Sequence, residues 1–413
     1  MDCNVFEKHR KSILAQMADN SILIEVSRNP EPESVVKQTY NLNRNYYYLC
    51  GVIEFENIVV LSKINGHDSE MIFINPYDEF KAKWTGAPLS KDEVVKISGI
   101  KNVRYLDTFN SVIERMIQTV ENVYVDVCPS GLNSIQTEDE AFASNIRNKF
   151  PWINIKNARG LFAHSRTIKE PEEIDEMKKA ISITNEGIKS ILRNMKEGYE
   201  YQIESYFDQA IKYYGATGYA FPTIAASGKN ATCLHYSENN SIAKNGDLIL
   251  FDLGASVNMY CADISRTFPV NGKFSERQKQ LYNIVLHAQE LVYKSAKPGV
   301  TTRDLNQVVV NYYQDALKEI GLIKEDNEVF NYYYHAVSHH IGLDCHDLCE
   351  YTPLKAGSVI SNEPGLYIKE EGIGIRIEDD MLITDDGAVW LSPQIIKNVE
   401  DIEEFMELEN KNE

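Results

Sequence analysis

The sequence predicts an α+β protein with two domains, a smaller α/β domain over residues 1–160 and a larger domain over residues 170–413. The chain has 413 residues, which is more than one hydrophobic core usually serves. Helical and extended segments alternate over the first part, a pattern typical of a compact domain with a mixed sheet. The second part contains long amphipathic helices and ends in short apolar runs interrupted by Gly and Pro, which indicates an antiparallel sheet.

Apolar spacing and turn residues place the elements of the first domain. Asn65 and Gly66 form a hairpin turn signal between two strands, and we expect this pair to lie within a longer loop. In chain order, the pattern predicts a helix over 4–18, strands over 22–26, 58–64 and 71–74, a helix over 109–120, a strand over 123–127, a helix over 138–149 and an extended segment over 153–155. The domain boundary is expected near residues 160–171.

The second domain is predicted to begin with a helix at Pro171, followed by two glutamates that suit a helix N-terminus. Ser275 and Gln278 form the two ends of a capping box, which predicts the start of another long helix. Two further helices are predicted, over residues 200–214 and 302–320. The segment 342–399 is expected to form antiparallel strands, and the acidic end of the chain is expected to be a solvated helix end.

The chain carries a formal net charge of −19, from 42 basic and 61 acidic residues. This charge argues against nucleic acid and anionic membranes as partners, because both require a basic surface. No apolar run is long enough to span a membrane, and charged residues stand where a signal peptide needs its apolar region. The seven cysteines are scattered without a CxxC pair, which is typical of reduced thiols and predicts a cytoplasmic protein.

The segment 247–267 contains two carboxylates, Asp252 and Asp263, on either side of residues that suit a turn. An antiparallel hairpin centred near residues 257–258 would place these two side chains directly opposite each other. Two buried carboxylates at that distance repel, and a cation between them removes the repulsion. The alternative interpretation is that each aspartate only flanks a turn.

Four of the nine histidines lie within one stretch of twelve residues: His335, His339, His340 and His346. A single histidine is more often a core or surface residue than a ligand, whereas four close together indicate a functional site. The spacing of His335 and His339 would let them share a helical face, but Gly342 and nearby β-branched residues favour an irregular or extended segment. The HExxH pattern is absent, so this stretch does not predict a zinc site of that class.

Two glutamates complete the candidate site. Glu363 ends an apolar run just before a Pro-Gly turn, and Glu378 shares one face of an alternating segment with Arg376. An exposed strand face would also explain Glu378 on its own.

Charge balance connects the four carboxylates, Asp252, Asp263, Glu363 and Glu378, with His339 as a neutral ligand. Two divalent cations balance four negative charges, and a carboxylate-rich set with one histidine favours Mn(II) or Co(II) over structural zinc. Two such ions about 3.5–4 Å apart activate a bridging hydroxide and stabilise the charge on an attacked carbonyl.

Five stretches of the second domain carry a resemblance to a known family: LFDLGA, CADISRTFPVNGKF, HAVSHHIGLDCHD, SNEPGLYI and GIRIEDDMLIT. Together they resemble the pita-bread metallopeptidases, and among these the Xaa-Pro aminopeptidases (aminopeptidase P). Residues 226–239 extend the resemblance upstream, and 44–45, 48–51 and 84–86 resemble that family's N-terminal domain. The resemblance implies a pita-bread catalytic domain over 170–413. It also implies an N-terminal domain that shapes the cleft and supports homodimers or homotetramers.

The resemblance also implies two divalent ions, with Mn(II) favoured and Co or Zn as alternatives. Their ligands would be Asp252, Asp263, His339, Glu363 and Glu378. Asp263 and Glu378 would bridge the two ions, Asp252 would chelate one of them, and His339 with Glu363 would complete the shell of the other. Glu363 would also carry a proton from the nucleophilic water to the leaving proline nitrogen.

Four further residues have implied roles in the pocket. His235 and His346 would orient the substrate and stabilise the tetrahedral intermediate, and His335 would help to enclose the proline ring. Arg376 would hold the carboxylate network in place. The chain departs from the family at residues 336–337, where relatives often have Gly-Leu, and at the additional His340. These differences concern the shape of the pocket and leave the metal ligands unchanged.

The implied activity is hydrolysis of the bond before a proline at the second position of a peptide, a tertiary amide without an N–H group. Spacing and charge indicate a metal site, whereas the specificity for proline comes from the resemblance alone. A prolidase, restricted to Xaa-Pro dipeptides, is the nearest alternative; the short connection from His346 to Glu363 leaves little room for a covering loop and favours the aminopeptidase. A methionyl aminopeptidase is weaker, because such enzymes do not need the N-terminal domain.

An alternative of another class is a non-catalytic peptide-binding module on the same fold. Such modules usually lose metal ligands, whereas this chain retains residues of the required type at all five positions.

Overall fold

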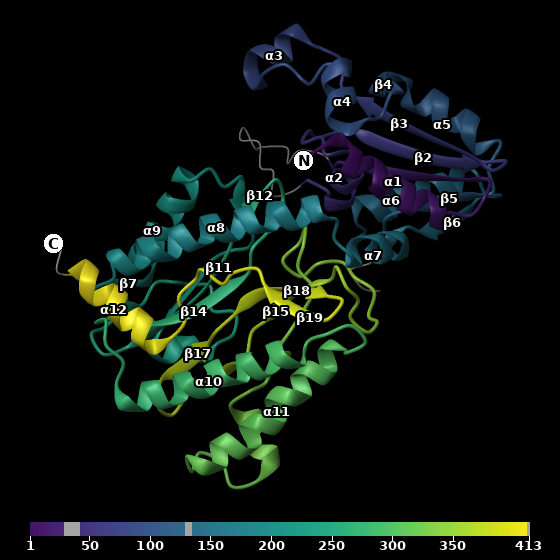
Figure 1. Cartoon of the computed structure of the whole chain (residues 1–413). Helices are drawn as coiled ribbons and strands as arrows, with labels where there is room; N and C mark the ends of the chain where they lie inside the picture. Colours follow the sequence, from purple (N-terminus) through teal and green to yellow (C-terminus); the bar gives the residue numbers. More distant parts are fainter. Residues whose placement is uncertain (29–41, 129–133, 411–413) are drawn as a thin grey trace. The chain divides into compact units, whose positions relative to one another are not determined.

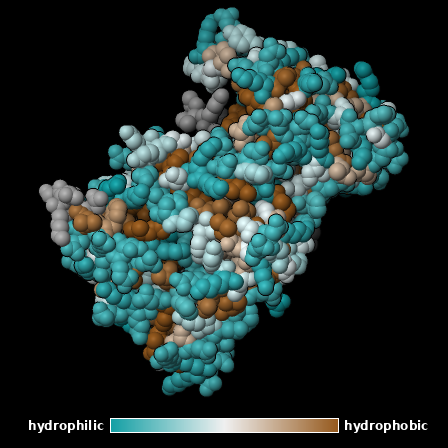
Figure 2. Space-filling model, viewed as in Figure 1, coloured by the Kyte–Doolittle hydropathy of each residue, from teal (hydrophilic) through white to brown (hydrophobic). Residues whose placement is uncertain are grey.

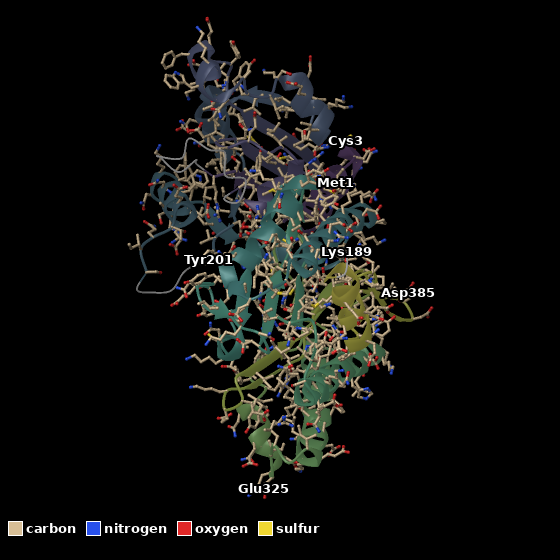
Figure 3. All side chains as sticks on the ribbon, turned by 90° about the vertical axis from the view of Figure 1, so that its left-hand side faces the viewer. Met1, Cys3, Lys189, Tyr201, Glu325 and Asp385 are labelled. Carbon is tan, nitrogen blue, oxygen red and sulfur yellow. The ribbon has the colours of Figure 1, made fainter. Side chains whose placement is uncertain are left out.

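The computed structural model describes residues 1–28, 42–128 and 134–410, which belong to two compact units, Met1–Arg166 and Thr167–Glu413 (Figure 1). Within the described ranges, no helix combines the length and the apolar character that crossing a membrane requires. Hydrophilic residues cover most of the surface visible in Figure 2, in keeping with the charged composition. Acidic side chains such as Glu325 and Asp385 project from loops of the second unit (Figure 3).

The N-terminal unit is built on a six-stranded mixed sheet with the order β4-β3-β2-β1-β5-β6. Strand β1 pairs antiparallel with β2 and parallel with β5, and the apolar faces of these strands pack against α5 and α6. The elements are α1 (Cys3–Gln16), β1 (Ser21–Val26), α2 (Arg44–Cys50), β2 (Ile58–Ile64), β3 (His67–Ile74), α3 (Glu79–Thr85), α4 (Lys91–Ser98), β4 (Val103–Tyr105), α5 (Phe109–Ile117), β5 (Asn122–Val125), α6 (Glu138–Lys149), β6 (Asn154–Asn157) and α7 (Arg159–Thr167).

The connection between β2 and β3 differs from the prediction. Asn65 and Gly66 alone form the turn, because Ile64 already pairs with His67, so the expected longer loop is wrong. Both turn residues have positive φ values, 51° and 72°, as a two-residue turn that matches the twist of the strands requires.

In the C-terminal unit, short antiparallel strands lie between two sets of helices, with α8 and α9 on one side and α10 and α11 on the other (Figure 1). The capping box of Ser275 and Gln278 is present at the start of α10, and Pro171 is the first residue of α8, as predicted. The helices are α8 (Pro171–Arg193), α9 (Glu200–Tyr213), α10 (Glu276–Ser295), α11 (Thr302–Glu319) and α12 (Val399–Asn410).

The strands of this unit form small sheets, among them β14-β11-β9, β15-β18-β19 and the pair β16-β17. Their bounds are β7 (Gly198–Tyr199), β8 (Gly218–Tyr219), β9 (Ile224–Ser227), β10 (Ile242–Ala243), β11 (Leu248–Leu253), β12 (Ala255–Val257), β13 (Tyr260–Cys261), β14 (Ile264–Pro269), β15 (Val359–Asn362), β16 (Gly365–Ile368), β17 (Ile373–Arg376), β18 (Asp379–Thr384) and β19 (Gly387–Trp390).

The hairpin that carries the two aspartates has a different register from the predicted one. Asp252 pairs with Ser265 and not with Asp263, because the turn is centred on residues 258–259, both with positive φ. The change of register is two residues, so Asp263 stays on the predicted face of the ribbon. Gly254 is not a turn residue: a Cβ atom there would lie 1.9 Å from the carbonyl oxygen of Ala262, and only glycine fits this close approach.

Candidate metal centre

The predicted ligands lie at the ends of strands in the middle of the C-terminal unit. They are Asp252 on β11, Asp263 immediately before β14, His339 beside β15, Glu363 immediately after β15 and Glu378 between β17 and β18. Backbone hydrogen bonds hold these strand ends together. The N–H of Glu378 donates to the carbonyl of Ser265 at 3.0 Å, and the N–H of Glu363 donates to the carbonyl of Val337 at 3.0 Å.

The side chains converge on a small space. The ligand atoms of Asp263, His339 and Glu378 all lie within 4.8 Å of one another. Nε2 of His339 lies 3.4 Å from Oδ2 of Asp263 and 3.3 Å from Oε1 of Glu363. Asp252 joins this group through Arg376, whose Nη2 lies 2.6 Å from Oδ2 of the aspartate. The structure therefore brings Asp263, His339 and Glu378 into mutual reach and places Glu363 against His339. Asp252 is linked to Glu378 through Arg376 and Ser265.

The electrostatics of this group are those of crowded, buried acids. Burial, followed by the negative charge of Asp263, raises the pKa of Glu378 well above its usual value. Burial also raises the pKa of Asp252, against the effect of Arg376, and raises the pKa of Glu363 to about 7. Burial alone would lower the pKa of His339, but its contact with Asp263 and the charge of Glu363 raise it to about 9. The raised pKa values mean that some of these carboxyl groups keep their protons, which limits the repulsion between negative charges. Added positive charge would release these protons.

Buried carboxylate oxygens without a hydrogen-bond partner indicate whether these residues fit a metal. Oδ1 of Asp252, Oε1 of Glu378 and Oδ1 of Asp380 are buried and have no hydrogen-bond partner among the described residues. Buried carboxylate oxygens without partners are costly, and they are the ligands that hard divalent cations prefer. The donor set therefore fits divalent cations.

The three pocket histidines lie around this group. Nε2 of His335 lies 2.8 Å from the hydroxyl of Tyr367, and burial lowers the pKa of this histidine to about 4, so its ring is neutral. The ring of His346 stacks on that of His339, with centroids 4.0 Å apart and an angle of 12° between the planes. His235 is exposed. Burial, followed by the effect of His339, lowers the pKa of His346.

Arg376 connects several polar side chains that the sequence analysis did not identify. Its Nε donates to Oγ of Ser265 at 2.8 Å and its Nη1 to the hydroxyl of Tyr367 at 3.2 Å. Ser265 in turn donates to Oε2 of Glu378 at 2.7 Å. Strand alternation could have identified Ser265, which is two residues after Asp263, whereas no sequence signal linked Tyr367 to the site.

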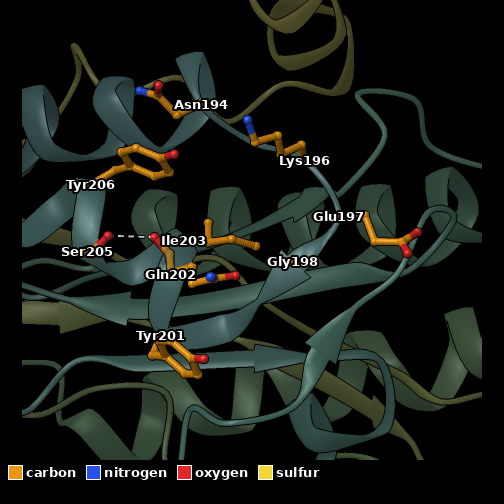
Figure 4. Close-up of a pocket in the computed structure, with 9 residues that line it drawn as sticks. All are labelled: Asn194, Lys196, Glu197, Gly198, Tyr201, Gln202, Ile203, Ser205 and Tyr206. Atoms are coloured by element: carbon orange, nitrogen blue, oxygen red, sulfur yellow. Dashed lines mark hydrogen bonds between the residues drawn. The ribbon is translucent and has the colours of Figure 1, made fainter.

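A separate cavity of about 400 Å³ lies near the end of α8 and the start of α9. Tyr201, Gln202 and Tyr206 are among its lining residues (Figure 4), and Oγ of Ser205 donates to the backbone oxygen of Gln202 at 2.6 Å. None of the described residues that line it belongs to the predicted site, and the lining has no cluster of acids or histidines. The chemistry of the chain is therefore assigned to the carboxylate cluster.

Two family models match the chain. Metallopeptidase family M24 matches residues 175–385, and the aminopeptidase P N-terminal domain matches residues 6–124. The M24 match contains all five predicted ligands.

Individual relatives agree over nearly the whole chain. The Xaa-Pro aminopeptidase of Haemophilus influenzae is 31% identical, over 97% of this chain and 96% of the relative. Among solved structures, a putative aminopeptidase P from Bacillus anthracis is 42% identical, with a TM-score of 0.96 and complete coverage of both chains. Aminopeptidase P from E. coli is 27% identical with a TM-score of 0.91, over 100% of this chain and 99% of that structure.

These matches confirm the predicted α+β fold, with a pita-bread catalytic domain preceded by the N-terminal domain typical of aminopeptidase P. They also confirm that the chain is a peptidase and not a module without catalytic activity. The chain belongs to metallopeptidase family M24, among the members that carry an aminopeptidase P N-terminal domain.

Proposed function

We propose that this peptidase removes the N-terminal residue of peptides whose second residue is proline, by hydrolysing the Xaa-Pro bond. The relatives named Xaa-Pro aminopeptidase and aminopeptidase P support this specificity, since they match the chain from end to end. The observation that carries the proposal is Glu363, a half-buried carboxyl in contact with His339 inside the carboxylate cluster.

Two divalent cations would be held by Asp252, Asp263, His339, Glu363 and Glu378. We propose Mn(II) as the native metal, with Co and Zn as alternatives, because four carboxylates and one imidazole form a predominantly oxygen donor set. When bound, the ions supply an activated water molecule as nucleophile and stabilise negative charge on the substrate carbonyl.

Glu363 would move the proton in this reaction. Its pKa of about 7 lets it accept a proton and return it at neutral pH, which is the condition for efficient general acid–base catalysis. Its two oxygens face different partners: Oε1 accepts a hydrogen bond from Oγ of Ser361 at 3.2 Å, and Oε2 lies 3.9 Å from Nδ1 of His335. Such contacts orient the carboxyl between the cluster and the pocket histidines.

The remaining side chains would bind and orient the substrate. His235 and His346 would contact the peptide near the attacked carbonyl, and neutral His335, held by Tyr367, would help to enclose the proline ring. Arg376 would be a positioning residue: buried and hydrogen-bonded to Tyr367 and Ser265, it holds Asp252 in place.

Comparing the hydrolysis of dipeptides and tripeptides distinguishes the proposed aminopeptidase activity from that of a prolidase. We expect the Mn(II)-loaded protein to hydrolyse Xaa-Pro-Xaa tripeptides and longer peptides with higher kcat/KM than Xaa-Pro dipeptides. A matched peptide with alanine in place of proline is the control for specificity. Hydrolysis of the dipeptide alone would identify a prolidase, and equal rates on the proline and alanine peptides would refute the specificity for proline.

We also propose that the N-terminal domain, residues 1–160, shapes the cleft and supports a homodimer or homotetramer, with the catalytic domain over 170–413. A cytoplasmic location is supported by the cysteines: all seven lie in the described ranges, and none of them forms a disulfide. Light scattering coupled to size-exclusion chromatography tests the oligomer, and a monomeric mass would refute it.

A further inference from the structure

A thiol lies inside the carboxylate cluster. Sγ of Cys345 donates to Oδ2 of Asp263 at 2.9 Å, so this cysteine contacts a residue proposed to hold both cations. The ligand atoms of Cys345, His339 and His346 also lie within 4.8 Å of one another. Two donor groups therefore meet at His339: one with two carboxylates, Asp263 and Glu378, and one with a sulfur and a second imidazole.

The two groups favour different metals. Carboxylate oxygens suit Mn and Mg, whereas thiolate sulfur with imidazole nitrogen suits Zn and its softer relative Cd. A thiophilic ion would therefore select the group that contains Cys345, whatever ion the carboxylates prefer.

The geometry of the histidines is compatible with a shared ion. Nδ1 of His339 lies 3.1 Å from the carbonyl oxygen of His340, a contact that fixes a proton on Nδ1, so a metal would bind at Nε2 in place of the proton there. The rings of His339 and His346 are nearly parallel, so one ring must turn to aim at a common ion. His346 is exposed and can turn without disturbing the core.

We propose that Cys345, His346 and His339 form a second cation site, specific for one thiophilic divalent ion such as Zn²⁺ or Cd²⁺. As the ion binds, the thiol of Cys345 and Nε2 of His339 release their protons to solvent, and Cys345 no longer donates to Asp263. The ion competes with the carboxylates for His339. This binding does not depend on the proposed peptidase specificity, so the proposal can be tested on protein that has no substrate.

Titration of chelator-stripped protein with Cd²⁺ tests the site, followed by the ultraviolet sulfur-to-cadmium charge-transfer absorption. We expect one sulfur-bound Cd²⁺ per chain in the parent protein and in the control Cys349→Ser, which removes a nearby cysteine outside the donor group. Both Cys345→Ser and Cys345→Val should lose the absorption. Two variants are used because serine keeps a hydrogen-bond donor to Asp263, whereas valine keeps an apolar side chain. His346→Ala should retain the absorption but require more Cd²⁺ to reach it.

Three results would overturn the proposal: no absorption from the parent protein at saturating Cd²⁺, full absorption from both Cys345 variants, or an unchanged titration midpoint in His346→Ala. Circular dichroism checks that each variant folds. If one Cys345 variant fails to fold, the other decides, and if both fail, the midpoint of His346→Ala decides.

Discussion

Replacing Glu363 with Gln is expected to lower turnover by roughly 10²–10⁴-fold while the fold is retained, because an amide cannot accept and return the proton. Gln has nearly the same size and can still accept the hydrogen bond that Ser361 makes at 3.2 Å. The measurement is kcat/KM on an Xaa-Pro-Xaa peptide with Mn(II), together with the melting temperature and the metal content of the variant.

Glu371→Gln is the matched control. This glutamate lies on an exposed turn and pairs with Arg277 at 2.6 Å, away from the carboxylate cluster, so its loss should leave kcat/KM near the parental value. A Glu363→Gln protein that binds metal and turns over substrate like the parent would show that another group moves the proton.

Adding Mn(II) to chelator-stripped protein is expected to raise its melting temperature strongly. The cause is the cluster of buried acids: burial raises the pKa of Asp252, Glu363 and Glu378, and cations would replace the retained protons and pair the orphaned oxygens. At about 100 times the dissociation constant, one bound ion stabilises the folded state by about 2.7 kcal/mol, a shift on the order of 5–10 °C. Differential scanning calorimetry measures the shift.

Asp263→Asn provides the comparison, because it removes one charge from the centre of the cluster without changing side-chain size. We expect a much smaller shift with Mn(II) in this variant than in the parent protein. Equal shifts in the two proteins, or no shift in the parent, would argue against a shared metal site at Asp263.

The long elements of the fold could be predicted because their signals are local. The capping box at Ser275 and the proline at position 171 define helix starts without reference to the rest of the chain. Helix α2 was missed, because its seven residues are too few to show a helical period. The hairpin turn was misplaced because Met259 has a positive φ of 70°, which no turn preference of methionine signals.

The charged members of the candidate site could also be predicted, since each ends or follows an apolar run that becomes a strand. The residues that connect them could not. Ser265 reaches Glu378 across 113 positions of sequence, and Cys345 reaches Asp263 across 82, so only the folded chain shows these contacts. Local pattern identifies which side chains suit a metal, and tertiary packing decides which neutral groups surround them.

The central claim is that the cluster holds two cations, and the metal content of the protein tests it most directly. After equilibration with Mn(II) and removal of unbound ions, elemental analysis should find two Mn per chain in the parent protein. Asp263→Asn should hold fewer, because this residue is proposed to bridge both ions. One ion per chain, or none, in the parent protein would contradict a dinuclear centre.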